Sequence, residues 1–154
     1  MGASDEAIEP YAAALADGIE AALPTWVVRC VVRVVTAWIG TVSQEVAEAA
    51  DMAGRQAQEE TGTAVRALLL SDIDDQRTTP LALLRSAVRY PTAVLEAAGA
   101  PPVERDRFLA DAFPRDVYDL SPSSFADVDP ALAELGITWG AAKAFAHKRR
   151  HRPA

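Results

Sequence analysis

Pairs of valines, set between two tryptophans, make residues 26–42 the most apolar part of the chain. At about 100° per residue, Arg29, Arg33 and Thr36 share one narrow sector of a helix, while apolar side chains fill an arc of roughly 240°. A buried strand is the alternative that valine favours, but its alternation would put both arginines on the same face as half of the valines. We therefore predict a helix covered on several sides, since an ordinary surface helix buries a stripe little wider than about 100°.

The helical period continues beyond residue 42 along one side only. One sector, which begins with the valines, continues through Val46, Ala49, Ala50, Ala53 and Ala57. The other sector, which we call the second apolar face, consists of Trp26, Val27, Cys30, Val34 and Trp38. Polar residues replace this second face one to two turns later. The pattern predicts one long central helix over residues 24–60, and Gly62 then indicates an end or a kink because glycine costs up to about 1 kcal/mol inside a helix.

Prolines mark the ends of shorter helices expected around this central helix. Residues 1–9 are predicted to be a loose N-terminus, and an amphipathic helix follows from Pro10 to just before Pro24. A polar turn is expected at residues 71–78. Beyond it, a proline preceded by a capping residue or by another proline indicates the first turn of a helix at four places: Pro80, Pro102, Pro122 and Pro130.

Further breaks are predicted in the second half of the chain. Pro91 is expected to break or kink the helix that starts at Pro80, which Gly99 ends. Gly136 is expected to close a short helix, and a last helix from about Thr138 dissolves into a basic tail at residues 148–154. The predicted fold is all-α: one domain over residues 1–154, a helical bundle around one long central helix, with short capped helices in the C-terminal third.

Charge is distributed unevenly along the chain. The net charge is −7, yet residues 143–154 carry five basic side chains and no acidic one, which leaves the rest of the chain at −12. An acidic body repels nucleic acid and anionic membranes. Nucleic-acid contact is therefore expected at most through the tail, at Lys148, Arg149, Arg150 and Arg152.

The sequence predicts a cytoplasmic protein. Asp5, Glu6 and Glu9 stand where a secretory signal would carry basic residues before an apolar run. Residues 26–42 are the one candidate membrane span, but two arginines at its middle would each cost about 2.5 to 3.5 kcal/mol at the bilayer centre. A buried helix of a water-soluble domain is the better interpretation. The single cysteine agrees with a reducing compartment.

Residues with reactive side chains do not form a known catalytic pattern. His147 and His151 have the spacing of two zinc ligands on a helix, but the expected third ligand is absent. The acidic turn at residues 72–75 resembles the start of a calcium loop without its glycine and its final glutamate. Aspartates between Asp116 and Asp129 could perform acid–base chemistry, although caps and turns explain them better. Cys30 is expected to fill the core. No catalytic, cofactor or metal site is predicted.

Several short motifs in the second half resemble those of a known group of proteins. They are the run at residues 112–120 (AFPRDVYDL), Asp129 followed by Pro130, and the run at residues 139–144 (WGAAKA). With these motifs the chain is similar, over roughly residues 79–148, to small uncharacterised all-helical proteins of high-GC actinobacteria. The resemblance implies a cytoplasmic bacterial protein and brings no activity and no functional residue with it.

Three functions are open at this point. The second apolar face favours a non-enzymatic protein–protein interaction or regulatory module, with self-association as a homodimer as one version. The same face could instead line a pocket for an apolar small molecule or lipid. An enzyme that uses residues 116–129 is the third hypothesis. Equally, the chain's own helices could cover the face, which would leave it without a role in binding.

Overall fold

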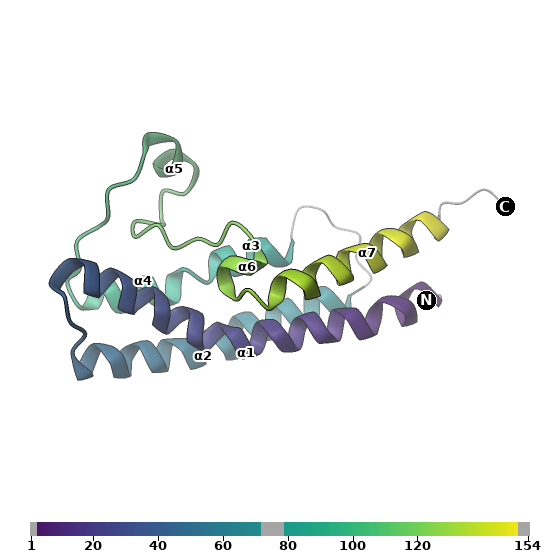
Figure 1. Cartoon of the computed structure of the whole chain (residues 1–154), viewed down its shortest axis with the longest axis horizontal. Coiled ribbons are helices and arrows are strands. Elements are labelled where there is room, and N and C mark those ends of the chain that lie inside the picture. The colour runs from purple at the N-terminus through teal and green to yellow at the C-terminus, as the bar shows by residue number, and fades with distance from the viewer. Residues whose placement is uncertain (1–2, 72–78, 151–154) are drawn as a thin grey trace.

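The structure is a computed structural model that describes residues 3–71 and 79–150. Within these ranges the chain forms helices and no strand. In order they are α1 (Ala3–Ile39), α2 (Gln44–Leu70), α3 (Pro80–Ser86), α4 (Arg89–Ala97), α5 (Arg107–Ala112), α6 (Phe125–Val128) and α7 (Leu132–Arg150). Figure 1 shows α1 and α2 side by side, with α7 along the N-terminal part of α1 and α5 projecting from the body. The predicted all-α bundle around one long helix is confirmed.

The long central helix lies further upstream than predicted. A single helix over residues 24–60 is wrong, because the chain reverses between Gly40 and Ser43 and forms an antiparallel hairpin of α1 and α2. Gly40 has a φ of +84°, a conformation that suits glycine after a helix end. The side chain of Ser43 accepts a hydrogen bond from the backbone N–H of Val46 at 3.2 Å and so caps α2.

The apolar sector that links both halves of the predicted helix is the hairpin interface. Val31 and Val35 on α1 and Ala50 and Ala57 on α2 are buried in one core. The apolar residues of α1 and those of α2 form two stripes that face each other. In the sequence, these two stripes show the same helical periodicity as one stripe on a single helix. The small residues of α2 allow the close approach of α1 that the sequence favoured.

α1 passes through Pro24, where the sequence predicted its end. Proline has no N–H, so the carbonyl oxygen of Glu20, four residues earlier, loses its helical donor. The side-chain nitrogen of Gln58 on α2 donates to that oxygen at 2.8 Å. Gly54 provides the space, since a Cβ there would lie 2.9 Å from both the Cα and the carbonyl oxygen of Pro24. The neighbouring helix therefore compensates for the proline.

α2 is continuous through Gly62, where the sequence predicted an end or a kink. A Cβ at Gly62 would lie 2.8 Å from Cγ of Glu20, so this glycine also marks close contact. One turn later, Arg66 binds Glu20 and Asp17 of α1, with N–O distances of 2.8 and 2.5 Å. Both glycines of the α2 interface thus serve packing against α1.

Several other helix boundaries differ from the prediction. α1 begins at Ala3, so residues 3–9 are helical and not loose. The side chain of Thr79 caps α3 as expected, and Gly99 follows α4 with a φ of +81°. The break near Pro91 falls earlier, at residues 87–88, and Pro91 lies in the first turn of α4.

The helix boundaries of the C-terminal third differ as well, and the short helix predicted to close at Gly136 is part of α7. α5 begins at Arg107, not at Pro102, because Asp106 caps it through the N–H of Leu109. α7 begins at Leu132 and continues through Gly136 to Arg150. Gly136 accommodates the ring of Phe125, which a Cβ would approach to 2.5 Å. The predicted polar turn lies largely outside the described residues.

Candidate functional site

The second apolar face is largely covered by the protein itself. Trp26, Val27, Cys30 and Val34 are all buried, whereas Trp38 is 40% exposed. Besides α2, helices α4, α6 and α7 pack against α1. Four of the five candidate residues therefore lie in the core, and Trp38 is the one that a partner can reach.

The polar sector of α1 holds the irregular C-terminal backbone in place. Arg29 donates to the carbonyl oxygen of Val128 at 2.7 Å, and Arg33 donates to that of Asp119 at 3.3 Å. These two arginines interrupt the valine pairs, and in the structure they bind carbonyl groups that helices would otherwise satisfy internally. Tyr118, Leu120 and Val128 of the segment they hold belong to the same buried core as the second apolar face.

Cys30 is buried, lies close enough to Asp116 of this segment for the carboxylate to raise its pKa, and has the properties of a core residue. Burial raises the pKa of its thiol to about 11, against the smaller lowering effects of Arg33 and Arg29. A thiol with such a pKa stays protonated near neutral pH and is a poor nucleophile. The structure therefore agrees with the expected role of Cys30 in packing.

Three of the C-terminal aspartates bind backbone N–H groups. Asp116 is 4% exposed, and its carboxylate accepts from Leu120 at 2.8 Å and from Ser121 at 2.8 Å. Asp127 accepts from the N–H of Ser123, and Asp129 accepts from that of Ala131. These contacts are those of turn and cap residues.

The end of the α1–α2 hairpin carries exposed apolar side chains. Trp38 is 40% exposed and Ile39 is 55% exposed. They border a hollow of about 380 Å³ between the hairpin turn and the C-terminal end of α4, lined by Val35, Trp38, Ile39, Ser43, Glu45, Val46, Ala49, Val94, Ala97 and Ala98. We call this region the tip surface. Glu45 is the one charged residue among those that line it.

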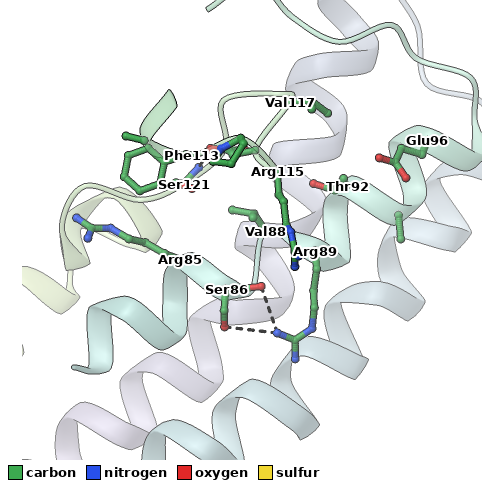
Figure 2. Close-up of a pocket in the computed structure, with 14 residues that line it drawn as sticks. Arg85, Ser86, Val88, Arg89, Thr92, Glu96, Phe113, Arg115, Val117 and Ser121 are labelled. Carbon is green, nitrogen blue, oxygen red and sulfur yellow. Dashed lines mark hydrogen bonds between the residues drawn. The ribbon is translucent and has the colours of Figure 1, made fainter. Parts of the chain in front are cut away.

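A larger groove of about 790 Å³ lies beside α4. Residues 85–96 of α3 and α4 form one wall, and residues 112–121 form the other. Figure 2 shows Arg115 reaching from the second wall across the groove toward α4. Its lining includes three arginines, Arg85, Arg89 and Arg115, against two acids, Glu96 and Asp116. The groove is thus positively charged in a protein of net charge −7.

Hydrogen bonds fix two of the three arginines. Arg85 donates from Nε to the carbonyl oxygen of Pro122 at 3.1 Å. Arg89 donates to the carbonyl oxygen of Ser86 at 3.2 Å and to the hydroxyl of Tyr90 at 2.9 Å. Arg115 has no hydrogen-bond or ion-pair partner in the part of the chain that the structure describes. Nothing in the sequence pattern indicated this groove, because its two walls lie about 25 residues apart in the chain.

The remaining predicted sites fall mostly outside the described residues. The acidic turn at residues 72–75 is one of these, as are His151, Arg152 and the side chain of His147. Among the described residues, no group of three or more His, Cys, Asp or Glu could hold a metal ion. α7 carries the start of the basic tail as far as Arg150.

We compared this all-α bundle with known proteins. Family models, curated proteins and solved structures were compared with the chain, and none of them matches it. The resemblance to actinobacterial helical proteins stays a prediction. Residues Ile8–Ile39 of α1 have the length and hydropathy of a membrane span, and 44% of the 18-residue window on which this assignment rests is buried inside the protein.

Proposed function

We propose that the protein is a non-enzymatic helical interaction module that binds a second copy of itself through the tip surface. The observation that carries the proposal is the exposure of Trp38 and Ile39 beside an apolar hollow. Exposed aromatic and aliphatic side chains next to a pocket are typical of the energetic centre of an interface. The backbone contacts of Asp116, Asp127 and Asp129 support a role without catalysis.

A homodimer with twofold symmetry requires one patch that is complementary to itself. The tip surface offers both parts of such a patch, since Trp38 and Ile39 project next to the hollow of about 380 Å³. In a symmetric pair, the projecting side chains of each copy would fill the hollow of the other. The scarcity of charge there favours this contact, because the fully buried centre of an interface is depleted of charged residues.

Light scattering combined with size-exclusion chromatography tests this proposal. The wild-type protein is expected to show the mass of a dimer. The double variant Trp38→Glu/Ile39→Glu is expected to be a monomer with an unchanged circular dichroism spectrum, because truncating or charging such a centre weakens binding by about thirtyfold or more.

Ile137→Glu is the matched control. Ile137 is 72% exposed on α7, away from the hairpin end, so a glutamate introduced there should leave the mass unchanged. A wild-type protein that is monomeric at every concentration tested, or a dimer that survives the double variant, would overturn the proposal.

Small-molecule binding is the second candidate function, and the groove beside α4 supports it. The sequence suggested an apolar ligand on the second apolar face, but four of those five residues are buried among the protein's own helices. The groove of about 790 Å³ has the size of known ligand pockets, which range from about 300 to 1,000 Å³. Because three arginines line the groove, the ligand is expected to carry a negative charge and not to be purely apolar.

We also propose a cytoplasmic location for the protein. The single cysteine, which agrees with a reducing compartment, supports it. So does the packing of α2, α4, α6 and α7 around the apolar helix α1. Cell fractionation tests it: the protein should remain in the supernatant after membranes are sedimented, and recovery in the membrane pellet that requires detergent for extraction would contradict it.

A further inference from the structure

We propose that the groove between α4 and residues 112–121 binds a small organic anion, a free carboxylate or phosphate monoester that carries an apolar body. This inference rests on the second candidate function, that the groove is a ligand site. It adds the class of ligand and the residues that recognise it: Arg115 and Thr92 for the oxyanion, with Arg89 beside them.

Arg115 is placed to bind the anionic group. Its side chain extends across the groove toward Arg89, and it has no partner in the described parts of the chain. An arginine offers five N–H donors in a planar arrangement that matches a carboxylate or a phosphate. Two arginines on facing walls repel each other, and an anion between the walls would relieve that repulsion.

Arg89 contributes a positive charge whose position is already fixed. It donates to Ser86 and Tyr90, and it lies over the Tyr90 ring at 4.6 Å from the centroid. Tyr90 in turn donates to Glu60 at 2.9 Å. A ligand therefore meets a cation that needs no further ordering, which lowers the entropic cost of binding.

Thr92 supplies a polar atom without a partner. Its Oγ1 is buried and has no hydrogen bond within the described residues, although it lines the groove one turn beyond Val88. A buried hydroxyl left unpaired costs free energy, which a ligand oxygen would recover if Thr92 turned its hydroxyl into the groove. Figure 2 shows this hydroxyl on the side of α4 that Arg115 approaches.

The rest of the lining fits an apolar body. It consists largely of apolar side chains from both walls: Val88, Ala93, Ala112, Phe113, Pro114 and Val117. Arg85 lies 5.9 Å from the centroid of the Phe113 ring, at the other end of the groove from Glu96. The combination of an oxyanion site and an apolar floor selects an amphipathic anion over inorganic phosphate.

Glu96 allows the sign of the ligand's charge to be tested. It lines the same groove and has no ion-pair partner in the described residues. Its carboxylate repels an anion and attracts a cation. Replacing it with glutamine should therefore strengthen the binding of an anionic ligand, a result that loss of folding could not produce.

Calorimetric titration with four eight-carbon probes tests the class of ligand. Octanoate and octyl phosphate are expected to bind at least about tenfold more tightly than octanol, because a charge-assisted hydrogen bond contributes about 1.5 to 3 kcal/mol. Octylammonium is expected to bind most weakly, and inorganic phosphate alone should show no measurable binding. Phosphatidylglycerol vesicles, used in a sedimentation assay, should not bind the protein.

Variants then assign the site. Arg115→Gln is expected to weaken octanoate binding about tenfold, and Glu96→Gln is expected to tighten it about threefold. Arg55→Gln is the matched control, since Arg55 is exposed on α2 outside the groove and should leave binding unchanged. Circular dichroism verifies that all three variants are folded.

The outcomes separate the inference from the function on which it rests. Equal binding of octanol and octanoate would keep the groove as a ligand site and overturn anion recognition. Binding of none of the probes would overturn both. Binding to vesicles alone, or an equal loss in Arg115→Gln and Arg55→Gln, would also overturn the assignment.

Discussion

The α1–α2 hairpin and the segment between α4 and α7 (residues 98–131) satisfy their backbone in different ways. The hairpin is regular, and one side chain, Gln58, serves the single carbonyl that Pro24 leaves without a donor. The later segment has only short helices, and Asp116, Arg29 and Arg33 bind its peptide groups. The hairpin therefore depends on close apolar packing, whereas the segment depends on charged side chains that bind backbone.

The largest effect is expected where the two helices of the hairpin approach most closely. Gly54→Val would place side-chain atoms against the backbone of Pro24, which a Cβ already approaches to 2.9 Å. The helices would have to separate, at a cost of about 3 kcal/mol in the free energy of unfolding. Urea denaturation measures this change.

Gly140→Ala is the control for that variant. Gly140 lies in α7, and apart from its chain neighbours and the backbone of its own helix, no atom of the described residues comes within 4 Å of the position that a Cβ would take there. Alanine should therefore raise the free energy of unfolding by about 0.5 to 1 kcal/mol. If both variants changed the free energy of unfolding alike, close packing at Gly54 would not be what stabilises the hairpin.

A smaller effect is expected in the segment. Asp116→Asn keeps the size of the side chain but removes one acceptor oxygen and directs an amide at backbone N–H groups of Leu120 and Ser121. We expect a loss of about 2 kcal/mol, again measured by urea denaturation. Asp111→Asn, at an exposed site on α5, should change stability little. If Asp116→Asn left the free energy of unfolding unchanged, the segment would not depend on the charge of this carboxylate.

The smallest effect concerns the carbonyl oxygen of Glu20. Gln58→Ala removes its donor and should cost about 1 kcal/mol. In a Pro24→Ala background the helix regains its own N–H at this position, so the cost of Gln58→Ala should fall toward zero. A double-mutant cycle measures the difference, and additive effects would show that Gln58 does not compensate for Pro24.

Helical periodicity was sufficient to predict the fold class but not the path of the chain. The helical period of apolar residues continues past residue 42 because the apolar stripes of α1 and α2 face each other and have the same spacing. Gly40 followed by Ser43 is a stop and start signal that the sequence does contain. The passage of α1 through Pro24 is different, since it depends on Gly54 and Gln58, which lie about 30 residues or more away in the chain.

The candidate sites illustrate the same limit. The second apolar face was visible as an excess of apolar surface, but whether helices of the same chain cover it depends on tertiary packing. Trp38 lies at the end of α1 and stays 40% exposed, whereas Trp26, three turns earlier, is buried. The groove could not be predicted, because Arg89 and Arg115 come to line one groove only in the folded chain.

The buried thiol of Cys30 allows local opening of the core of α1 to be measured as a rate of chemical modification. A thiol reagent attacks the thiolate, which is scarce while burial keeps the pKa near 11. Modification then requires a local opening of the core around Cys30, so its rate reports the free energy of that opening. Because it is the only cysteine in the chain, native-state labelling of Cys30 times this opening at a single known position of α1.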